Sequence, residues 1–415
     1  METANQRIDD DARAPGGEAP ETDGAPGGGA RGGLDRLRAS LDEIDRRILG
    51  ALAERQRLIE ETARWKASAA DFLRDPAREE AMLGRLREEA RELGLDGFYV
   101  TALFRQIVEH AVRFQVDHFN GQHAEDAARP PLVVAYQGTD GAYSHLAAQR
   151  HFSGRAQAVD YRGHETFLGA VEAVEHGDST YALLPIENTT AGSINEVYDL
   201  LAERDLWIVG EEVLAVDHCL LALSPVALSH IRRIASHPQA IAQCGDFLRG
   251  LSHCRVESWP DTAMAARRVR DEKDLSLAAI ASAEAARRYG LAILRRGIAN
   301  RAANYTRFVA VAREPLRPDP RVPAKTSLCF VTIHEHGALA RCLEVLARRG
   351  LNLTKLESRP LADNPFQYRF YLDFEGNAAA PEVDRALAEL EPLTRRMRML
   401  GSYPIRRSEE ASRER

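Results

Sequence analysis

Hydrophobic residues recur at intervals of three and four through the first part of the chain, which is the spacing of one face of an amphipathic helix. That face is carried by Leu34, Leu37, Leu41, Ile44, Ile48 and Leu52. The segment "RDPAREE" predicts the start of a second helix, because Asp75 can cap it and Pro76 suits its first position. A third helix is expected from about Phe98 to Phe119. Residues 34–120 are therefore predicted to form an all-α helical bundle, whose thin core favours association between copies.

Two cations interrupt the apolar face of the first helix. The stripe is expected to be buried, yet Arg55 and Lys66 lie on it, beside Ile59. The two cations are ~16 Å apart along the helix axis and within ~20° in angle. Burying either charge without a partner would cost several kcal/mol. An internal salt bridge to an acid such as Glu79 would satisfy them, and so would an anionic ligand held inside the bundle. Gln115, on the inner face of the third helix, could reach the same ligand, since a buried amide also needs partners.

Arg38 adds a geometric constraint. It lies ~25 Å from Arg55 along the same helix and ~100° round it, so no small metabolite can touch both residues in one chain. If both serve one pocket, Arg38 must come from a second subunit, with the two long helices antiparallel. The alternative is that Arg38 is a solvated surface residue.

Beyond a polar linker, residues 120–131, the pattern changes to short apolar runs, each followed by a small polar turn and a helical stretch. Four such units occur: "LVVAYQGTDGAYSHLAAQ", "YALLPIENTTAGSINEVYDLL", "IRRIASHPQAIAQCGDFL" and "LAAIASAEAARRYG". This alternation predicts an α/β domain with mainly parallel sheets over residues 131–313. Polar turns at helix N-termini present N–H groups that attract anions, so the pattern indicates a carboxylate-bearing ligand.

A proline-rich linker, "REPLRPDPRVPAKT", separates this region from the last one. Residues 326–405 then read as strand, helix, strand, strand, helix and strand. That is the βαββαβ order of an α+β ferredoxin-like domain.

Composition narrows the class of protein. The chain has 415 residues, is 44% hydrophobic and 28% charged, and carries a net charge of −7, which does not favour nucleic acid as a partner. No apolar run approaches the ~18 residues of a membrane span. Residues 1–33 are about a third Gly or Pro and have no signal-peptide core, so a disordered tail is expected. These features predict a cytoplasmic protein with no membrane partner.

Metal chemistry has little support in the sequence. The "HEH" at His334–His336 lacks the spacing of a known metal site. The cysteines show no C-x-x-C pairing and are expected to be reduced thiols. They are Cys219, Cys244, Cys254, Cys329 and Cys342.

Three groups of motifs carry a resemblance to known proteins. "LRASLDEIDRRILGALAERQRLIEETARWK" followed by "RDPAREE" and Gln115 resembles the all-helical chorismate mutase domain. "AYQGTDGAYSHLAA", "LLPIENTTAGSINEVYDLL", "DHCLLAL", "SHPQA" and "NYTRF" resemble prephenate dehydratase, while "HGALARCLEVL" and "LESRP" resemble its amino-acid-sensing ACT domain. In this order the segments are similar to the bifunctional chorismate mutase–prephenate dehydratase (P-protein) family of phenylalanine biosynthesis. The resemblance covers about Leu34 to Tyr403.

The resemblance implies a mutase that rearranges chorismate to prephenate in a pocket shared by two subunits. Arg55 and Arg38 of the partner subunit would hold the two carboxylates, and Lys66 and Gln115 would donate to the ether oxygen. A pericyclic rearrangement needs no nucleophile or metal, only a folded substrate and donors aimed at developing oxygen charge. Ala111 departs from members that have Ser there. The implied substrate-binding residues are Arg38, Arg55, Lys66, Asp75, Arg78, Glu79 and Gln115.

The resemblance also implies a two-lobed dehydratase, like a periplasmic binding protein in fold, that converts prephenate to phenylpyruvate. Thr306 would be the essential residue, acting as a positioned hydrogen-bond donor because its hydroxyl is a feeble acid. Arg307 is expected to clamp a carboxylate. Glu187 remains an alternative proton donor. The implied substrate-binding residues are Asn188, Ser236, Gln243, Thr306 and Arg307.

Structural explanations for the same residues stay open. Asn188 and Ser236 could cap the helices that follow them, Gln243 could lie on a helix surface, and Thr306 could be an ordinary strand residue.

Phenylalanine is expected to bind the C-terminal domain as an allosteric inhibitor, at a subunit interface of a homodimer or larger homo-oligomer. A dimerisation module that binds no ligand is the alternative. No cofactor is implied, since neither reaction is a redox step. The implied effector-binding residues are Gly337, Ala338, Leu339, Glu357, Ser358, Arg359 and Asn364.

Two rival functions fit parts of the pattern. A carboxylate sensor without catalysis would explain the two-lobed domain and the ferredoxin-like domain, but would need neither Thr306 nor cations inside a helical bundle. A dehydratase with an inactive mutase domain, acting on prephenate or arogenate, is the other rival. The presence of Arg38, Arg55 and Lys66 argues against it.

Overall fold

The computed structural model of the chain describes residues 28–68, 76–119, 131–153, 157–333, 335–361 and 364–406. These residues fall into two units, one ending at Ile59 and the other beginning at Glu60. No helix in the described ranges is long and apolar enough to cross a membrane.

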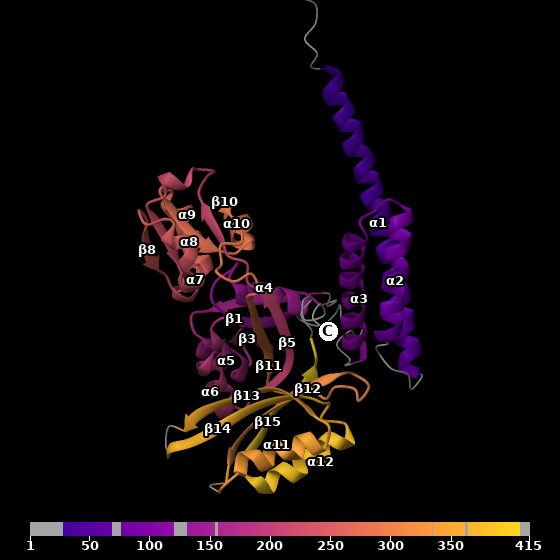
Figure 1. The fold of residues 1–415 in the computed structure, drawn as a ribbon, viewed down its shortest axis with the longest axis vertical. Coiled ribbons are helices and arrows are strands. Elements are labelled where there is room, and N and C mark those ends of the chain that lie inside the picture. The colour runs from indigo at the N-terminus through magenta and orange to yellow at the C-terminus, as the bar shows by residue number, and fades with distance from the viewer. Residues whose placement is uncertain are drawn as a thin grey trace, which may run out of the picture. The chain divides into compact units, whose positions relative to one another are not determined.

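Three helices form the N-terminal region, as the hydrophobic spacing predicts: α1 Gly28–Ser68, α2 Pro76–Glu92 and α3 Gly97–Phe119 (Figure 1). Because α1 begins at Gly28, the expectation of a disordered tail is wrong for residues 28–33, and residues 1–27 lie outside the described ranges. The expected cap Asp75 also lies outside them. Asp96 starts α3, since its Oδ1 accepts a 2.7 Å hydrogen bond from the Phe98 N–H.

From Leu34 to Leu52 the apolar stripe of α1 is exposed in the single chain, contrary to the expectation that it is buried, whereas Ile59 farther along is 9% exposed. Leu37 is 65% exposed and Ile48 is 53% exposed. In the described part of the first unit there is one helix only, and a lone helix cannot bury its own apolar face. By contrast, α2 and α3 pack together and bury Leu83, Ala90 and Ala111.

The central region contains two sheets, each forming one lobe (Figure 1). The first has the order β2-β1-β3-β11-β5, with the short β4 paired to β3. Its strands are β1 Leu132–Gln137, β2 Val159–His164, β3 Tyr181–Asn188, β4 Gly192–Ser193, β5 Trp207–Ala215 and β11 Tyr305–Ala312. The second has the order β10-β6-β9-β7-β8. Its strands are β6 Cys219–Ala222, β7 Arg233–Ser236, β8 Arg255–Ser258, β9 Leu277–Ala281 and β10 Ala292–Arg295.

Both sheets are mixed, so the expectation of mainly parallel sheets is only partly correct. In the first, β1 runs parallel to β2 and β3, but β11 is antiparallel to both β3 and β5. In the second, β7 is parallel to β8 and β9, whereas β6 is antiparallel to β9 and β10. The chain leaves the first lobe after β5 and returns as β11, and this crossing reverses the strand direction.

Short helices cover the two sheets. The first lobe carries α4 Tyr143–Phe152, α5 Phe167–Glu175 and α6 Asn195–Glu203. The second carries η1 Leu228–His230, α7 Pro238–Gln243, α8 Gly245–Arg249, α9 Thr262–Glu272 and α10 Ala283–Tyr289. Residues of α5 and α6 belong to the core on one face of the first sheet, and residues of α4 belong to the core on the other face.

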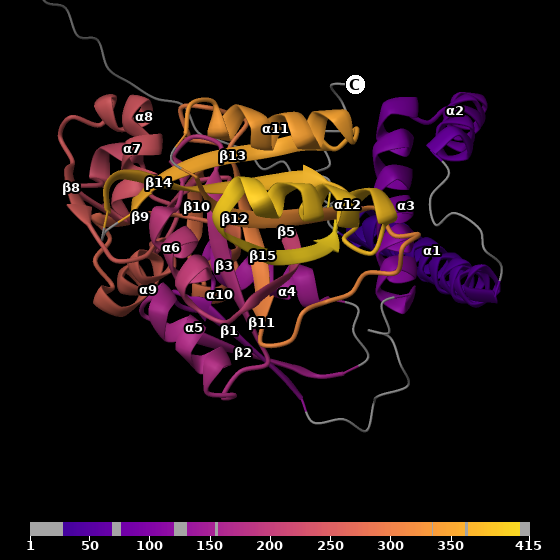
Figure 2. The ribbon, with the colours of Figure 1, turned by 90° about the horizontal axis from the view of Figure 1, so that it is seen from below.

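The C-terminal domain has the predicted βαββαβ order, with sheet order β13-β14-β12-β15. Its elements are β12 Ala324–Thr332, α11 Ala338–Arg348, β13 Asn352–Leu361, β14 Asn364–Glu375, α12 Pro381–Leu390, η2 Glu391–Leu393 and β15 Thr394–Pro404. The helices α11 and α12 pack along one face (Figure 2). From the other face Tyr371, Leu400 and Tyr403 enter the core of the first lobe. A Cβ on Gly401 would lie 2.1 Å from the Ile208 carbonyl oxygen, so only glycine permits this approach. The C-terminal domain and the first lobe therefore share one core.

Candidate active site

A buried polar cluster forms where β3 and β11 pair. Thr306 lies opposite Asn188 in the antiparallel register, and both side chains are more than nine-tenths buried. Asn188 Nδ2 donates to Thr306 Oγ1 at 3.0 Å and to Asn304 Oδ1 at 2.9 Å. Its Oδ1 accepts from the Thr190 N–H at 3.0 Å, so Asn188 shapes a turn after β3 rather than capping a helix. The Asn188 amide thus orients the Thr306 hydroxyl.

Gln243, the last residue of α7, brings the second lobe into this cluster. Its Nε2 donates to Asn188 Oδ1 at 3.2 Å and to Thr190 Oγ1 at 2.6 Å. Its Oε1 accepts from Asn304 Nδ2 at 3.1 Å and lies 2.8 Å from His218 Nε2. The two lobes therefore meet through side-chain amides and hydroxyls.

His218 lies behind Gln243 and is 2% exposed. Burial lowers the pKa of His218, and the hydrogen bond with Gln243 offsets this only in part. The ring is therefore neutral at neutral pH. Because Gln243 Oε1 can only accept, the proton of the neutral ring belongs on Nε2.

Two expected site residues do not join the cluster. Ser236 is fully buried and donates to the Ile280 carbonyl at 2.6 Å, across the second sheet. Glu187, next to Asn188, lies 3.1 Å from Lys355 Nζ of the C-terminal domain. Neighbouring residues of a strand face opposite sides of the sheet, so Glu187 points away from Thr306. Neither geometry fits the role expected from sequence.

Arg307 also departs from expectation. Its guanidinium contacts Glu211 at 2.9 Å, Asp373 at 2.6 Å and the Tyr403 hydroxyl at 2.9 Å, all on the face of β11 opposite Thr306. A guanidinium held there by protein carboxylates is not a carboxylate clamp for a ligand beside Thr306.

The candidate residues on the helices are divided between the two units. Arg38 is exposed and lies 3.5 Å from Asp35 on its own helix. Arg55 is half-buried, and this burial lowers its pKa. Glu79, Lys66 and Gln115 are half-buried in the second unit, and Arg78 is exposed there.

Three of the expected effector residues, Glu357, Ser358 and Arg359, lie on two faces of β13. The register pairs Leu353 with Phe374 but Lys355 with Asp373, so a bulge at Thr354 reverses which residues face the first lobe. Glu357 then accepts a 2.6 Å hydrogen bond from Ser193 Oγ.

Arg359 follows the same face as Glu357 and lies 2.8 Å from Asp199 of α6. Ser358 is exposed and pairs with Phe370, whose side chain packs against the core under α11 and α12. Gly337 opens α11 with φ +72°, a backbone conformation that favours glycine, and Ala338 and Leu339 follow it. Asn364 begins β14, but its side chain lies outside the described part of the chain.

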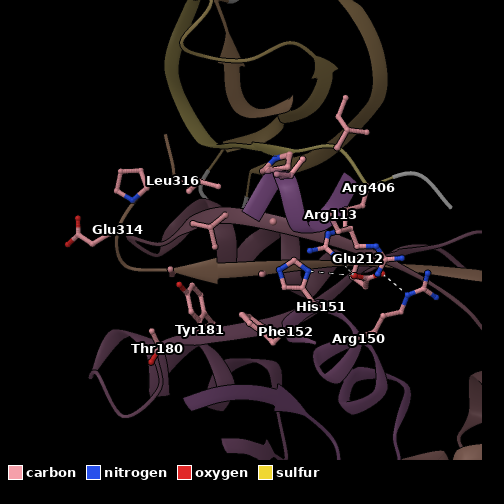
Figure 3. Close-up of a pocket in the computed structure, with 18 of the residues that line it drawn as sticks. Arg113, Arg150, His151, Phe152, Thr180, Tyr181, Glu212, Glu314, Leu316 and Arg406 are labelled. Carbon is pink, nitrogen blue, oxygen red and sulfur yellow. Dashed lines mark hydrogen bonds and ion pairs between the residues drawn. The ribbon is translucent and has the colours of Figure 1, made fainter. Parts of the chain in front are cut away.

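A cavity of about 420 Å³ lies on another part of the first lobe (Figure 3). Glu212, 3% exposed, contacts Arg150 at 3.1 Å and Arg406 at 3.0 Å beside this cavity. Burial alone would raise the pKa of Glu212, but a hydrogen bond from His151 and the charge of Arg406 lower it overall. A Cβ on Gly210 would lie 2.7 Å from the His151 ring. The described lining contains none of the residues expected to bind substrate.

Comparisons with known proteins decide the family. A chorismate mutase type II family model matches residues 37–116, and a prephenate dehydratase family model matches residues 134–316. The bifunctional chorismate mutase/prephenate dehydratase of Enterobacter agglomerans is 38% identical over 372 residues, which are 89% of this chain and 95% of that relative. The chain belongs to this bifunctional family. It is a chorismate mutase and a prephenate dehydratase, converting chorismate to prephenate and prephenate to phenylpyruvate.

Solved structures resemble the dehydratase part of the chain. A prephenate dehydratase from Arthrobacter aurescens, in complex with L-Phe, is 30% identical with a TM-score of 0.60, covering 66% of this chain and 90% of that one. GqqA, described as a novel type of quorum quenching acylase, is 37% identical with a TM-score of 0.60, covering 66% of this chain and 98% of that one.

Three members of the dehydratase cluster were not singled out by sequence reasoning: Thr190, His218 and Asn304. Each lies inside a motif segment that carried the family resemblance, in "PIENTT", "DHCLLAL" and "NYTRF" respectively. The signal was therefore present. What the motifs could not show is that Gln243 hydrogen-bonds to all three side chains.

Proposed function

We propose that prephenate is bound and converted at the cluster of Asn188, Gln243 and Thr306. Support comes from one observation, the buried hydrogen-bonded junction where hydroxyl and amide groups of both lobes meet. The Thr306→Ala variant, assayed for phenylpyruvate, is its direct test.

The chemistry explains why a hydroxyl is needed there. When the ring carboxylate of prephenate leaves as carbon dioxide, its electron pair moves into the ring and expels hydroxide. The departing oxygen gains charge, so it requires a hydrogen-bond or proton donor. Among the described residues, the Thr306 hydroxyl accepts a hydrogen bond from Asn188 and donates none. Its own hydrogen can therefore be directed at the substrate.

We propose that the mutase step uses Lys66 and Gln115 as donors to the ether oxygen, with Arg55 and Arg38 of the partner subunit holding the carboxylates. Glu79, Asp75 and Arg78 complete the expected pocket wall. Half-burial of Lys66, Gln115 and Arg55 supports this. Because burial disfavours the Arg55 charge, an anionic ligand beside it would restore favourable electrostatics.

A homodimer is part of this proposal. The exposed leucines and isoleucines of α1 form a continuous apolar stripe on a helix of 41 residues. Such a stripe favours a second copy as its cover. Arg38 and Arg55 are ~25 Å apart along α1, so an antiparallel pairing of two α1 helices would bring each Arg38 near the other subunit's Arg55.

Mixing an Arg38→Ala chain with a Lys66→Ala chain is expected to restore part of the mutase activity that each homodimer lacks. One of the two composite pockets of each mixed dimer would contain both native residues. The measurement is mutase turnover after subunit exchange, with exchange verified by differently tagged chains. Exchange without any recovered activity contradicts a shared pocket. A mixture of two preparations of the Lys66→Ala chain, treated identically, is the control.

We propose that residues 34–120, 131–313 and 326–405 serve as mutase, dehydratase and effector domains, and that the last is an ACT domain that binds L-phenylalanine. The βαββαβ order and the glycine turn before α11 support this. The solved prephenate dehydratase with L-Phe is a further support. Binding would inhibit the dehydratase by favouring a less active arrangement, with a coupling of ~1–3 kcal/mol.

Ser358→Ala is expected to weaken phenylalanine binding by about tenfold, the loss typical of removing one hydrogen bond to a charged group. Ser358 is exposed on the face of β13 away from the dehydratase, so the substitution should not disturb that domain. Calorimetry on the full-length chain measures the binding. Asn352→Ala, at an exposed position of the same strand, is the matched control. Undiminished binding in Ser358→Ala would locate the effector elsewhere.

A further inference from the structure

A buried network of charges lies directly behind Thr306. It is centred on Arg307, whose side chain is 13% exposed. Arg307 Nε donates to Glu211 of β5, which is 0% exposed at the side chain. Lys325 Nζ also donates to Glu211, at 2.8 Å and 3.0 Å to its two oxygens. The dehydratase domain thus supplies one carboxylate and one guanidinium, and the C-terminal domain supplies the ammonium.

The rest of the network belongs to the C-terminal domain. Arg307 Nη1 donates to Asp373 at 2.6 Å, and Nη2 donates to the Tyr403 hydroxyl at 2.9 Å. Ser327 Oγ donates to Asp373 at 2.6 Å and lies 2.7 Å from the Tyr403 hydroxyl. Burial alone would raise the pKa of Asp373, but the charge of Arg307 and the Ser327 hydrogen bond hold it below its usual range. Two cations and two anions therefore balance inside the interface.

The backbone at this point is paired regularly on one edge only: β11 keeps its register with β5 through Arg307 and Phe308, but not with β3. Regular pairing of β11 with β3 is interrupted between Arg307 and Phe308, because the partners jump from Glu187 to Pro185. Pro185 has no N–H to give the ladder, and Ile186 is an extra residue, as in a β-bulge. A guanidinium held by three groups therefore adds a restraint to β11 beside its irregular pairing with β3.

We propose that Arg307 is a positioning residue for the dehydratase step, through which Glu211, Asp373 and Tyr403 hold the Thr306 hydroxyl in its working place. The proposal rests on the function proposed for Thr306. Thr306 and Arg307 are consecutive residues facing opposite sides of one strand, so a shift of the guanidinium moves the hydroxyl. The C-terminal domain thereby belongs to the architecture of the dehydratase site, independently of any effector.

Arg307→Lys and Asp373→Asn are the variants that test it. Lysine keeps the charge but cannot make the three-pronged contact. Each variant is expected to lower dehydratase kcat by ~10–100-fold, the range for a displaced catalytic group, with KM for prephenate within about threefold. The double variant should lose little more than the worse single variant, because both act on one network. In a Thr306→Ala background, Arg307→Lys should have almost no further effect.

Arg398→Lys is the matched control. Its guanidinium also crosses from the C-terminal domain to the first lobe, donating to the Leu206 carbonyl at 2.9 Å, and it contacts none of the network. Its kcat should stay within twofold of wild type. Mutase turnover and the unfolding midpoint, measured on every variant, identify chains that fail to fold.

Four outcomes would overturn the proposal. A rise in KM with unchanged kcat would make Arg307 a substrate clamp. An equal loss of kcat in Arg398→Lys would show that any weakening of the interface between the C-terminal domain and the first lobe lowers kcat, with no specific role for Arg307. Wild-type kcat in Arg307→Lys and Asp373→Asn, combined with an inactive Thr306→Ala, would show that Arg307 does not position Thr306. The proposed role of Thr306 in the dehydratase step would then still hold. Full activity in Thr306→Ala would instead refute both.

Discussion

Thr306→Ala is expected to reduce phenylpyruvate formation from prephenate by ~10²–10³-fold, the loss typical of removing one transition-state hydrogen-bond donor. Mutase turnover should remain within about twofold of wild type. The hydroxyl is buried, is oriented by the Asn188 amide, and lies at the junction of the two lobes. In such a buried site, replacing the lost Thr306 hydroxyl by a water molecule costs free energy. Steady-state assays with prephenate and with chorismate measure the two steps on the same preparation.

Thr306→Val and Thr306→Ser separate the hydroxyl from the side-chain shape. Valine keeps the volume but has no O–H, so it should be as inactive as alanine. Serine keeps the O–H and should retain a substantial part of kcat. If the valine variant forms phenylpyruvate at nearly the wild-type rate, Thr306 has no chemical role.

Lys66→Ala is expected to lower mutase turnover by ~10²-fold or more, since it removes a cation aimed at the oxygen of the breaking bond. Dehydratase activity on supplied prephenate should persist, because Thr306 and its partners lie outside helices α1, α2 and α3. The side chain of Lys66 is half-buried near the end of α1. Assays with chorismate and with prephenate, run side by side, give the ratio of the two losses.

Arg64→Ala is the matched control for Lys66→Ala. It removes a cation two residues away on the same helix, where the side chain is 70% exposed. Mutase turnover should hardly change in that variant. A parallel loss of both activities in Lys66→Ala would show that the substitution unfolds the chain or that one site serves both reactions.

Much of the architecture was predictable because it depends on local periodicity. The three- and four-residue spacing of leucines and isoleucines is sufficient for a long α1, and the βαββαβ order of residues 326–405 follows from short apolar runs. The motif segments also contained every residue of the dehydratase cluster except Gln243, which lies three residues after "SHPQA". Even so, the apolar stripe of α1 was expected to be buried and is exposed in the single chain. Periodicity identifies an apolar face but does not show which segment or molecule covers it.

Sequence reasoning did not predict which segments contact each face of a strand, and the reason is physical. The sequence alone determined that Thr306 and Arg307 face opposite sides of one strand, since side chains alternate. Only the tertiary structure decided that the C-terminal domain covers the Arg307 side and that Gln243 of the second lobe meets the Thr306 side. Likewise the bulge at Thr354 decided that Glu357 and Arg359 contact the dehydratase while Ser358 does not. Alternation is a local property of the backbone, whereas the neighbour of each face is set by packing between segments far apart in the chain.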